Sequence, residues 1–126
     1  MHLISAARLD DKTKGGNRTK IFIEACDRYC ERKGRHYTFD IYTNPMGVSI
    51  NSINVALRQP RPDIRPYIAN ADVLVQLSND METFCYSDNE ALEYGVPIVT
   101  TPLTVLKELP IPEEAMLVCN WDMSNV

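Results

Sequence analysis

The chain has 126 residues, of which 44% are apolar, and a net charge of −4. This length fits one globular domain that buries about two thirds of its surface without needing a disulfide or metal. The apolar runs fall far short of the roughly 18 residues that a membrane-spanning helix needs. The acidic balance argues against a nucleic-acid-binding protein.

The charge is spread unevenly along the chain. Residues 1–37 carry nine Lys and Arg against five Asp and Glu, a net of +4. The remaining 89 residues carry four against twelve, a net of −8. A basic segment on an otherwise acidic domain fits a small anionic ligand better than a polyanion.

The chain has four cysteines, none of them in a C-x-x-C pair: Cys26, Cys30, Cys85 and Cys119. Only His2 and His36 could join them, so the sequence offers no cluster with the spacing of a metal site. We therefore expect four reduced, mostly buried thiols in a cytoplasmic protein.

Apolar runs alternate with helical patterns along the chain, which is typical of a parallel sheet with crossover helices. The first helix is expected to follow an N-cap at Asn17 and to end before Gly34. A short helix is expected over residues 62–69, and another from Ser87 to Gly95. The six expected strands cover residues 3–9, 38–43, 53–57, 73–77, 97–100 and 115–119.

Six strands in a doubly wound sheet usually take the order 3-2-1-4-5-6, and ligands bind at the carboxyl ends of strands one and four. The segments that follow those strands, 8–16 and 78–89, are chemically the richest in the sequence. Cations before Gly15-Gly16 could hold a phosphate together with backbone N–H groups. An ordinary solvated loop is the simpler interpretation, and the spacings of a Walker loop and of G-x-G-x-x-G are absent.

The second segment contains Ser87 and Glu90 at the S-x-x-E spacing of a capping box. In a capping box the glutamate only ties down the start of its own helix, so this interpretation competes with a ligand-binding role. Glu82 could likewise be a solvated loop acid. Asp80 and Glu82 alone are too few carboxylates for a metal site.

Two glutamates, Glu82 and Glu90, are followed by Ala-Leu-Glu-Tyr-Gly-Val-Pro-Ile-Val. This segment resembles the E-x7-E signature of retaining glycosyltransferases with the GT-B fold, the group 1 or glycogen-synthase-like family. Upstream, Arg8-Leu9 with Lys14-Gly15 resembles the R-L…K-G segment of that family, and Tyr67-Ile-Ala-Asn-Ala-Asp-Val resembles its Y-x-x-A-D-V stretch. These matches run in order along most of the chain.

Two departures from the family pattern concern the donor site. Lys14 lies six positions after Arg8, where the family usually has five, so Lys12 is a rival for the same role. Thr83 stands where a glycine is common after the first glutamate.

The resemblance implies that residues 1–126 form a single Rossmann-like, donor-binding domain, the C-terminal half of a GT-B enzyme. The N-terminal, acceptor-binding domain would lie outside this chain, so this half alone is expected to be inactive. The enzyme would be a retaining hexosyltransferase of polysaccharide biosynthesis that uses a UDP-, GDP- or ADP-sugar. No cofactor, metal or nucleic-acid partner is expected, and peripheral membrane association of the full-length protein stays open.

The resemblance also implies roles for single residues. As catalytic residues, Arg8 and Lys14 would stabilise the leaving diphosphate, and Glu82 would accept hydrogen bonds from hydroxyls of the donor sugar. Glu90 would accept hydrogen bonds from the ribose hydroxyls. The donor-binding set is completed by four residues between the glutamates: Phe84, Cys85, Tyr86 and Ser87. Weaker candidates for contacts to the base are Thr43 and Asn44.

Two alternatives belong to other functional classes. A signalling receiver domain would use acidic residues such as Asp10 and Asp11 after the first strand. It also needs a lysine at the end of strand five, where this chain has Thr100-Thr101-Pro102 and no lysine before Lys107. A non-catalytic module that binds nucleotide sugars is the second alternative.

Overall fold

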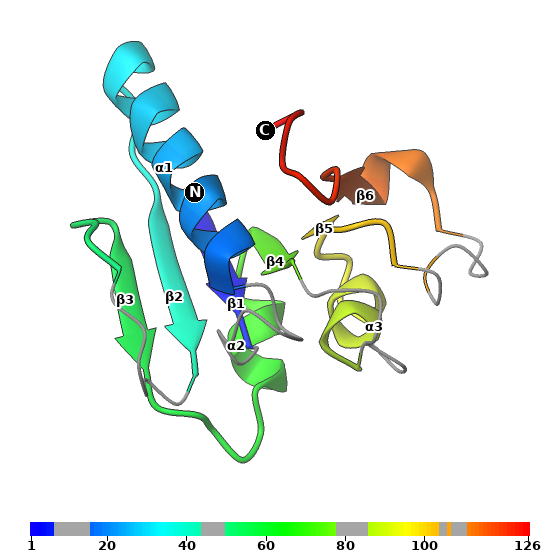
Figure 1. Ribbon diagram of the computed structural model, residues 1–126. Coiled ribbons are helices and arrows are strands. Elements are labelled where there is room, and N and C mark those ends of the chain that lie inside the picture. Colours follow the sequence, from blue (N-terminus) through cyan, green and yellow to red (C-terminus); the bar gives the residue numbers. More distant parts are fainter. Residues whose placement is uncertain (7–15, 44–49, 78–85, 104–105, 107–110) are drawn as a thin grey trace.

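The fold is a six-stranded sheet with the order β3-β2-β1-β4-β5-β6, in which every pair of neighbours is parallel. The computed structural model describes residues 1–6, 16–43, 50–77, 86–103, 106 and 111–126. Figure 1 shows the sheet running from β3 at the left to β6 at the right. The strands are β1 (His2–Ser5), β2 (Thr38–Tyr42), β3 (Val55–Arg58), β4 (Val73–Gln76), β5 (Ile98–Thr100) and β6 (Met116–Val118). The predicted fold class, a doubly wound Rossmann-like α/β sheet, is confirmed.

Three α-helices connect the strands: α1 (Gly16–Lys33), α2 (Arg65–Ala69) and α3 (Tyr86–Glu93). A short 3-10 helix, Glu113–Ala115, precedes β6. As predicted, glycines follow the two longer α-helices, with φ of 62° at Gly34 and 73° at Gly95. Residues with a side chain rarely adopt this left-handed backbone conformation, so glycine ends these helices at little conformational cost.

Several boundaries differ from the predicted ones. The helix α1 already begins at Gly16, so Asn17 lies inside it and is not the N-cap. The strand β1 ends at Ser5, whereas the prediction continued to residue 9, and residues 7–9 lie outside the described part of the chain. The helix α2 begins at Arg65 because the Asp63 carboxylate accepts a hydrogen bond from the Arg65 backbone N–H at 3.1 Å, which fixes a turn before the helix.

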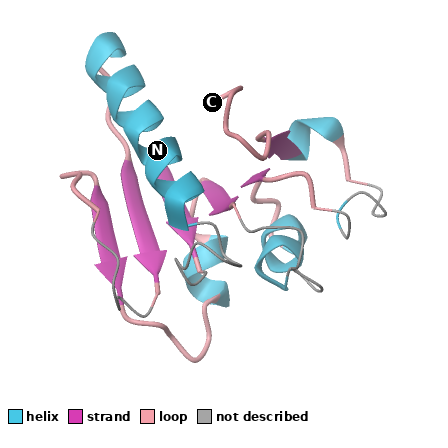
Figure 2. Ribbon diagram, viewed as in Figure 1, coloured by secondary structure: helices cyan, strands magenta, loops and turns pink. Residues whose placement is uncertain are grey.

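Figure 2 shows the helices that flank the sheet, and each face of the sheet carries its own apolar core. On one face, Phe22 of α1 packs edge-on against Phe39 of β2, with ring centroids 6.3 Å apart. On the other face, Ile68 of α2 and Ala91 of α3 are fully buried against the sheet. Covering both faces is what an all-parallel sheet requires, and it explains why its strands read as continuous apolar runs.

The composition of the strands changes at their carboxyl ends. The centre of the sheet is apolar, but several buried side chains at or just beyond the strand ends are polar: Ser5, Thr43, Gln76, Thr100 and Thr101. A buried polar side chain costs stability unless a hydrogen bond compensates for the lost water, so apolar residues are normally preferred at such positions. The polar groups therefore mark the carboxyl edge of the sheet as the edge to search for a site.

Candidate functional site

The carboxyl edge is organised around the neighbouring strands β1 and β4. From β1 the chain continues to α1 and then to β2 on one side, and from β4 it continues through α3 to β5 on the other. Both helices begin at the edge where these strands end (Figure 1). Helix N-termini present N–H groups and a partial positive charge, so this point of the sheet is suited to an anionic ligand.

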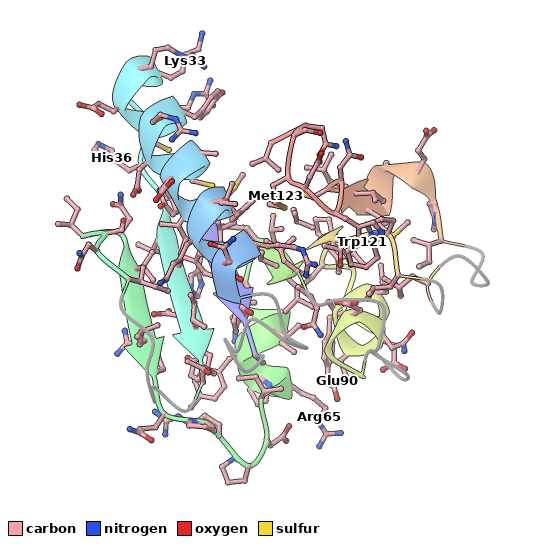
Figure 3. All side chains as sticks on the ribbon, in the orientation of Figure 1. Lys33, His36, Arg65, Glu90, Trp121 and Met123 are labelled. Carbon is pink, nitrogen blue, oxygen red and sulfur yellow. The ribbon has the colours of Figure 1, made fainter. Side chains whose placement is uncertain are left out.

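Glu90 is the one residue predicted to be catalytic or donor-binding whose side chain lies within the described residues. It projects from the middle of α3 at the lower edge of the molecule, on the same side as the start of α2 (Figure 3). Its Oε2 atom is shielded from solvent and has no hydrogen-bond partner in the described part of the chain. A shielded carboxylate oxygen without a donor costs stability, which makes Glu90 a candidate for binding a ligand.

The capping-box interpretation of Glu90 does not agree with the helix boundaries. A capping box needs Ser87 at the N-cap, immediately before the helix. The helix α3 begins at Tyr86, so Ser87 lies inside its first turn.

Arg65, at the start of α2, is the basic residue that acts on Glu90. Its guanidinium forms two hydrogen bonds to Asp63, at 2.8 and 3.0 Å. These bonds and the charge of Asp63 raise the pKa of Arg65, and Tyr94 and Glu90 raise it further. Glu90 thus lies within the electrostatic reach of the Arg65 guanidinium.

The remaining predicted site residues are only partly located. The predicted positions outside the described residues are Arg8, Lys12, Lys14, Asn44, Glu82, Phe84 and Cys85. For Tyr86 and Ser87 only the backbone is described, and it forms the first turn of α3. Thr43 is buried at the end of β2, and its backbone N–H donates to the Arg58 carbonyl at 2.9 Å.

The comparison with known families agrees with this arrangement. The model of a family described as "Glycosyl transferases group 1" matches residues 2–125. The chain belongs to the group 1 glycosyltransferase family. No curated protein matches the chain in a direct comparison.

Family membership and strand order together exclude a signalling receiver domain. A receiver-type doubly wound domain has the strand order 2-1-3-4-5, whereas this glycosyltransferase domain has 3-2-1-4-5-6. Within the described residues, no helix is both long and apolar enough to cross a membrane. No group of three His, Cys, Asp or Glu in this part of the chain could hold a metal ion.

Sequence reasoning missed Gln76, the last residue of β4. It is 5% exposed, and its Oε1 atom has no hydrogen-bond partner among the residues that the structure describes. Gln76 pairs in register with Thr100 of the neighbouring strand β5. Its own strand, β4, is one of the two central strands from which the chain winds in opposite directions. A glutamine in an otherwise apolar strand (Val-Leu-Val-Gln) was the available signal, because such a position is normally apolar.

Arg18, in the first turn of α1, was also missed. Its Nε donates to the Trp121 carbonyl at 3.1 Å, its Nη1 donates to the Leu77 carbonyl at 3.3 Å, and its guanidinium lies 5.1 Å from the centre of the Trp121 ring. Arg18 therefore ties the end of β4 to the C-terminal segment beside α1. A cation in the first turn of a helix opposes the helix dipole, and this unfavourable placement was the signal in the sequence.

Proposed function

We propose that this domain binds the nucleoside-diphosphate sugar donor of a retaining glycosyltransferase at the carboxyl edge of its sheet. The observation that carries the proposal is the Glu90 carboxylate, whose Oε2 atom is shielded and lacks a hydrogen-bond donor at the edge where α3 begins. The diol of a ribose offers two hydroxyl protons to such a carboxylate. Group 1 family membership supports the same class of ligand.

The diphosphate would bind between the segments that follow β1 and β4. The first turn of α1 has no acidic residue, and Arg18 adds a positive charge near the end of β4. Arg8 and either Lys14 or Lys12 would add cations in the segment between β1 and α1. Departure of the sugar leaves extra negative charge on the diphosphate, and fixed cations and backbone N–H groups stabilise that charge most when it has fully developed.

Glu82 would complete the donor site by accepting hydrogen bonds from hydroxyls of the transferred sugar. Loss of the diphosphate builds positive charge on the sugar, so a nearby carboxylate stabilises the transition state as well as orienting the ring. The acceptor would approach from a second domain. Transfer by this domain alone is not expected, because half of the cleft and its closure over the substrates would be missing.

A titration of the domain with UDP-, GDP- and ADP-sugars, followed by calorimetry, tests the proposal. We expect saturable binding of a donor with one of the three bases, and equal or tighter binding of the corresponding nucleoside diphosphate. Free hexose without a nucleotide should not bind measurably, since most contacts are to the nucleotide. Absence of binding by all three donors and their diphosphates would contradict the proposal.

A further inference from the structure

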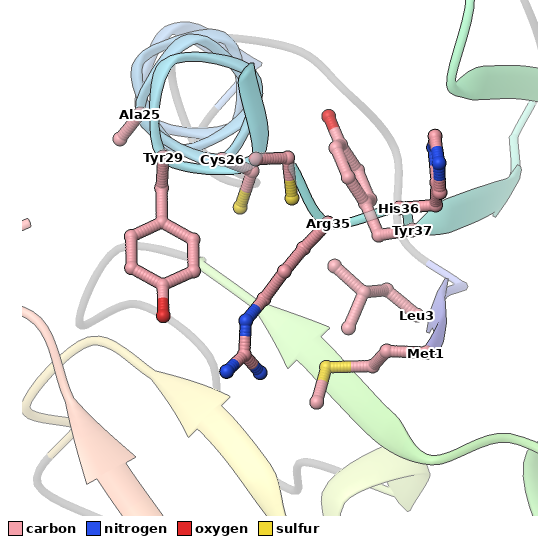
Figure 4. Close-up of a pocket in the computed structure, with 9 residues that line it drawn as sticks. Met1, Leu3, Ala25, Cys26, Tyr29, Arg35, His36 and Tyr37 are labelled. Carbon is pink, nitrogen blue, oxygen red and sulfur yellow. The ribbon is translucent and has the colours of Figure 1, made fainter. Parts of the chain in front are cut away.

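A pocket lies at the amino edge of the sheet, opposite the candidate donor site, between α1 and the start of β1. Its volume is about 570 Å³, and it is lined mainly by apolar and aromatic side chains. Leu3 and Met1 form one side, and Ala25, Cys26 and Tyr29 of α1 form another (Figure 4). Pockets of this size and composition, with a few polar groups, are typical of small-molecule sites.

Arg35 gives this pocket its polarity. Its side chain extends across the pocket, and its guanidinium lies between Tyr29 and Met1 (Figure 4). No carboxylate of the described residues pairs with it, and none of the described residues that line the pocket is acidic. His36 and Met1 also line the pocket, so none of its described lining residues brings a carboxylate to oppose Arg35.

Two other polar groups of the lining, the Tyr37 hydroxyl and the Cys26 thiol, are already engaged or held neutral. The Tyr37 hydroxyl donates to Asp27 at 2.6 Å, so the tyrosine offers the pocket its ring. Burial, followed by the neighbouring Cys30, Asp27 and Cys119, raises the pKa of the Cys26 thiol to about 11. The thiol is therefore neutral at physiological pH and acts as an apolar surface.

We propose that this pocket binds a small amphipathic anion, an apolar chain that ends in a carboxylate, with Arg35 holding the head group. An apolar lining favours the chain through burial, and a planar guanidinium matches a carboxylate with two parallel hydrogen bonds. The donor site occupies the other end of the strands. The two ligands therefore bind independently, and a negative result at one of the two sites does not contradict the other.

Calorimetric titration with decanoate, below its micelle concentration, tests this site. Decanoate should bind saturably and at least tenfold more tightly than 1-decanol, which has the same chain without the charge. The variant Arg35→Gln should weaken decanoate binding roughly tenfold and leave decanol unchanged. The matched control Arg28→Gln removes the same charge from an exposed position of α1 outside the lining and should bind decanoate like the wild type.

A variant that fills the pocket provides the second arm. Ala25→Phe adds a ring at the half-exposed wall and should abolish binding of both ligands, while circular dichroism and binding of the nucleoside diphosphate report that the domain is folded. Equal affinity for decanoate and decanol, an equal loss in Arg28→Gln, or no saturable binding would overturn the proposal. Binding only to anionic phospholipid vesicles, insensitive to Ala25→Phe, would show a membrane-facing surface and would also overturn it.

Discussion

The side-chain oxygens at the two edges of the sheet differ in their hydrogen bonding. At the amino edge, Oδ1 of Asp27 accepts hydrogen bonds from Tyr37, Asn54 and Ser52, at 2.6, 3.0 and 3.1 Å. At the carboxyl edge, Oε2 of Glu90 and Oε1 of Gln76 are shielded from solvent without a partner among the described residues. Satisfied polar groups stabilise a fold, and unsatisfied ones weaken it unless a ligand completes them. We therefore expect the hydrogen-bonded carboxylate of Asp27 to contribute to stability, and the two partnerless oxygens at the carboxyl edge to take part in donor binding.

The largest effect should follow from removing a cation at the carboxyl edge. Arg8→Ala should weaken nucleoside-diphosphate binding about 10- to 150-fold, since a hydrogen bond to a charged phosphate contributes about 1.5–3 kcal/mol. The melting temperature should stay nearly unchanged. Binding is measured by calorimetry, with Arg28→Ala as the control, and the same test on Lys12 and Lys14 identifies the phosphate lysine. Unchanged affinity in Arg8→Ala would refute the phosphate role.

At the amino edge, we expect a substitution to lower stability without weakening donor binding. Asp27→Ala removes three hydrogen bonds that join α1 to β2 and to the segment before β3, so the free energy of unfolding should fall by about 2 kcal/mol. Donor binding by the folded fraction should not change. Urea unfolding measures the loss, and Glu31→Ala, at an exposed position of the same helix, is the control. A loss in Asp27→Ala no larger than in Glu31→Ala would contradict a stabilising role.

The Asp27 carboxylate should also make the stability of the fold depend on pH. Burial by itself would raise the pKa of Asp27, but the hydrogen bonds from Tyr37, Asn54 and Ser52 outweigh it and lower the pKa below 3.8. Ionised Asp27 therefore stabilises the fold above that pH, and this contribution is lost as the pH falls through the folded-state pKa. The stability difference between wild type and Asp27→Asn should shrink below about pH 4. A difference that stays constant down to about pH 2.5 would argue against this linkage.

A smaller effect, of opposite sign, is expected for Gln76. Gln76→Met replaces an amide whose Oε1 atom lacks a partner among the described residues by an apolar side chain of similar length, so the free energy of unfolding should rise by about 1 kcal/mol. Urea unfolding measures this change, and Thr100→Val, at the neighbouring position on β5, provides a comparison, because its hydroxyl donates to the Thr101 carbonyl and its removal should destabilise. Destabilisation by Gln76→Met would show that the amide has a structural partner.

Much of the fold follows from local patterns in the sequence. Apolar runs separated by helical periodicity predicted six parallel strands and their order, because a doubly wound sheet leaves few alternatives. Glycine at position 34 marked the end of α1. The boundaries were less predictable: Asn17 has the side chain of an N-cap, yet the helix already begins at Gly16. A boundary of this kind depends on tertiary packing as well as on local propensity.

The candidate site was less predictable than the fold. The spacing of Glu82 and Glu90 drew attention to the segment that contains α3, but only the three-dimensional arrangement shows that Oε2 of Glu90 is shielded and lacks a partner among the described residues. Arg18 contacts Trp121, 103 positions away in the chain, and Gln76 of β4 pairs with Thr100 of the neighbouring strand β5. No local pattern encodes such long-range contacts.

The most direct test of the account compares Glu90→Gln with Glu93→Gln, the same substitution at an exposed position three residues further along α3. A glutamine keeps the size of the side chain but loses the charge and one acceptor, so Glu90→Gln should bind the nucleoside diphosphate about 5- to 30-fold more weakly. Its thermal stability should match that of the wild type, and Glu93→Gln should change neither property. Unchanged binding in Glu90→Gln, with a loss of about 1 kcal/mol of stability in Glu90→Ala, would show that Glu90 only stabilises its helix and would contradict the donor site.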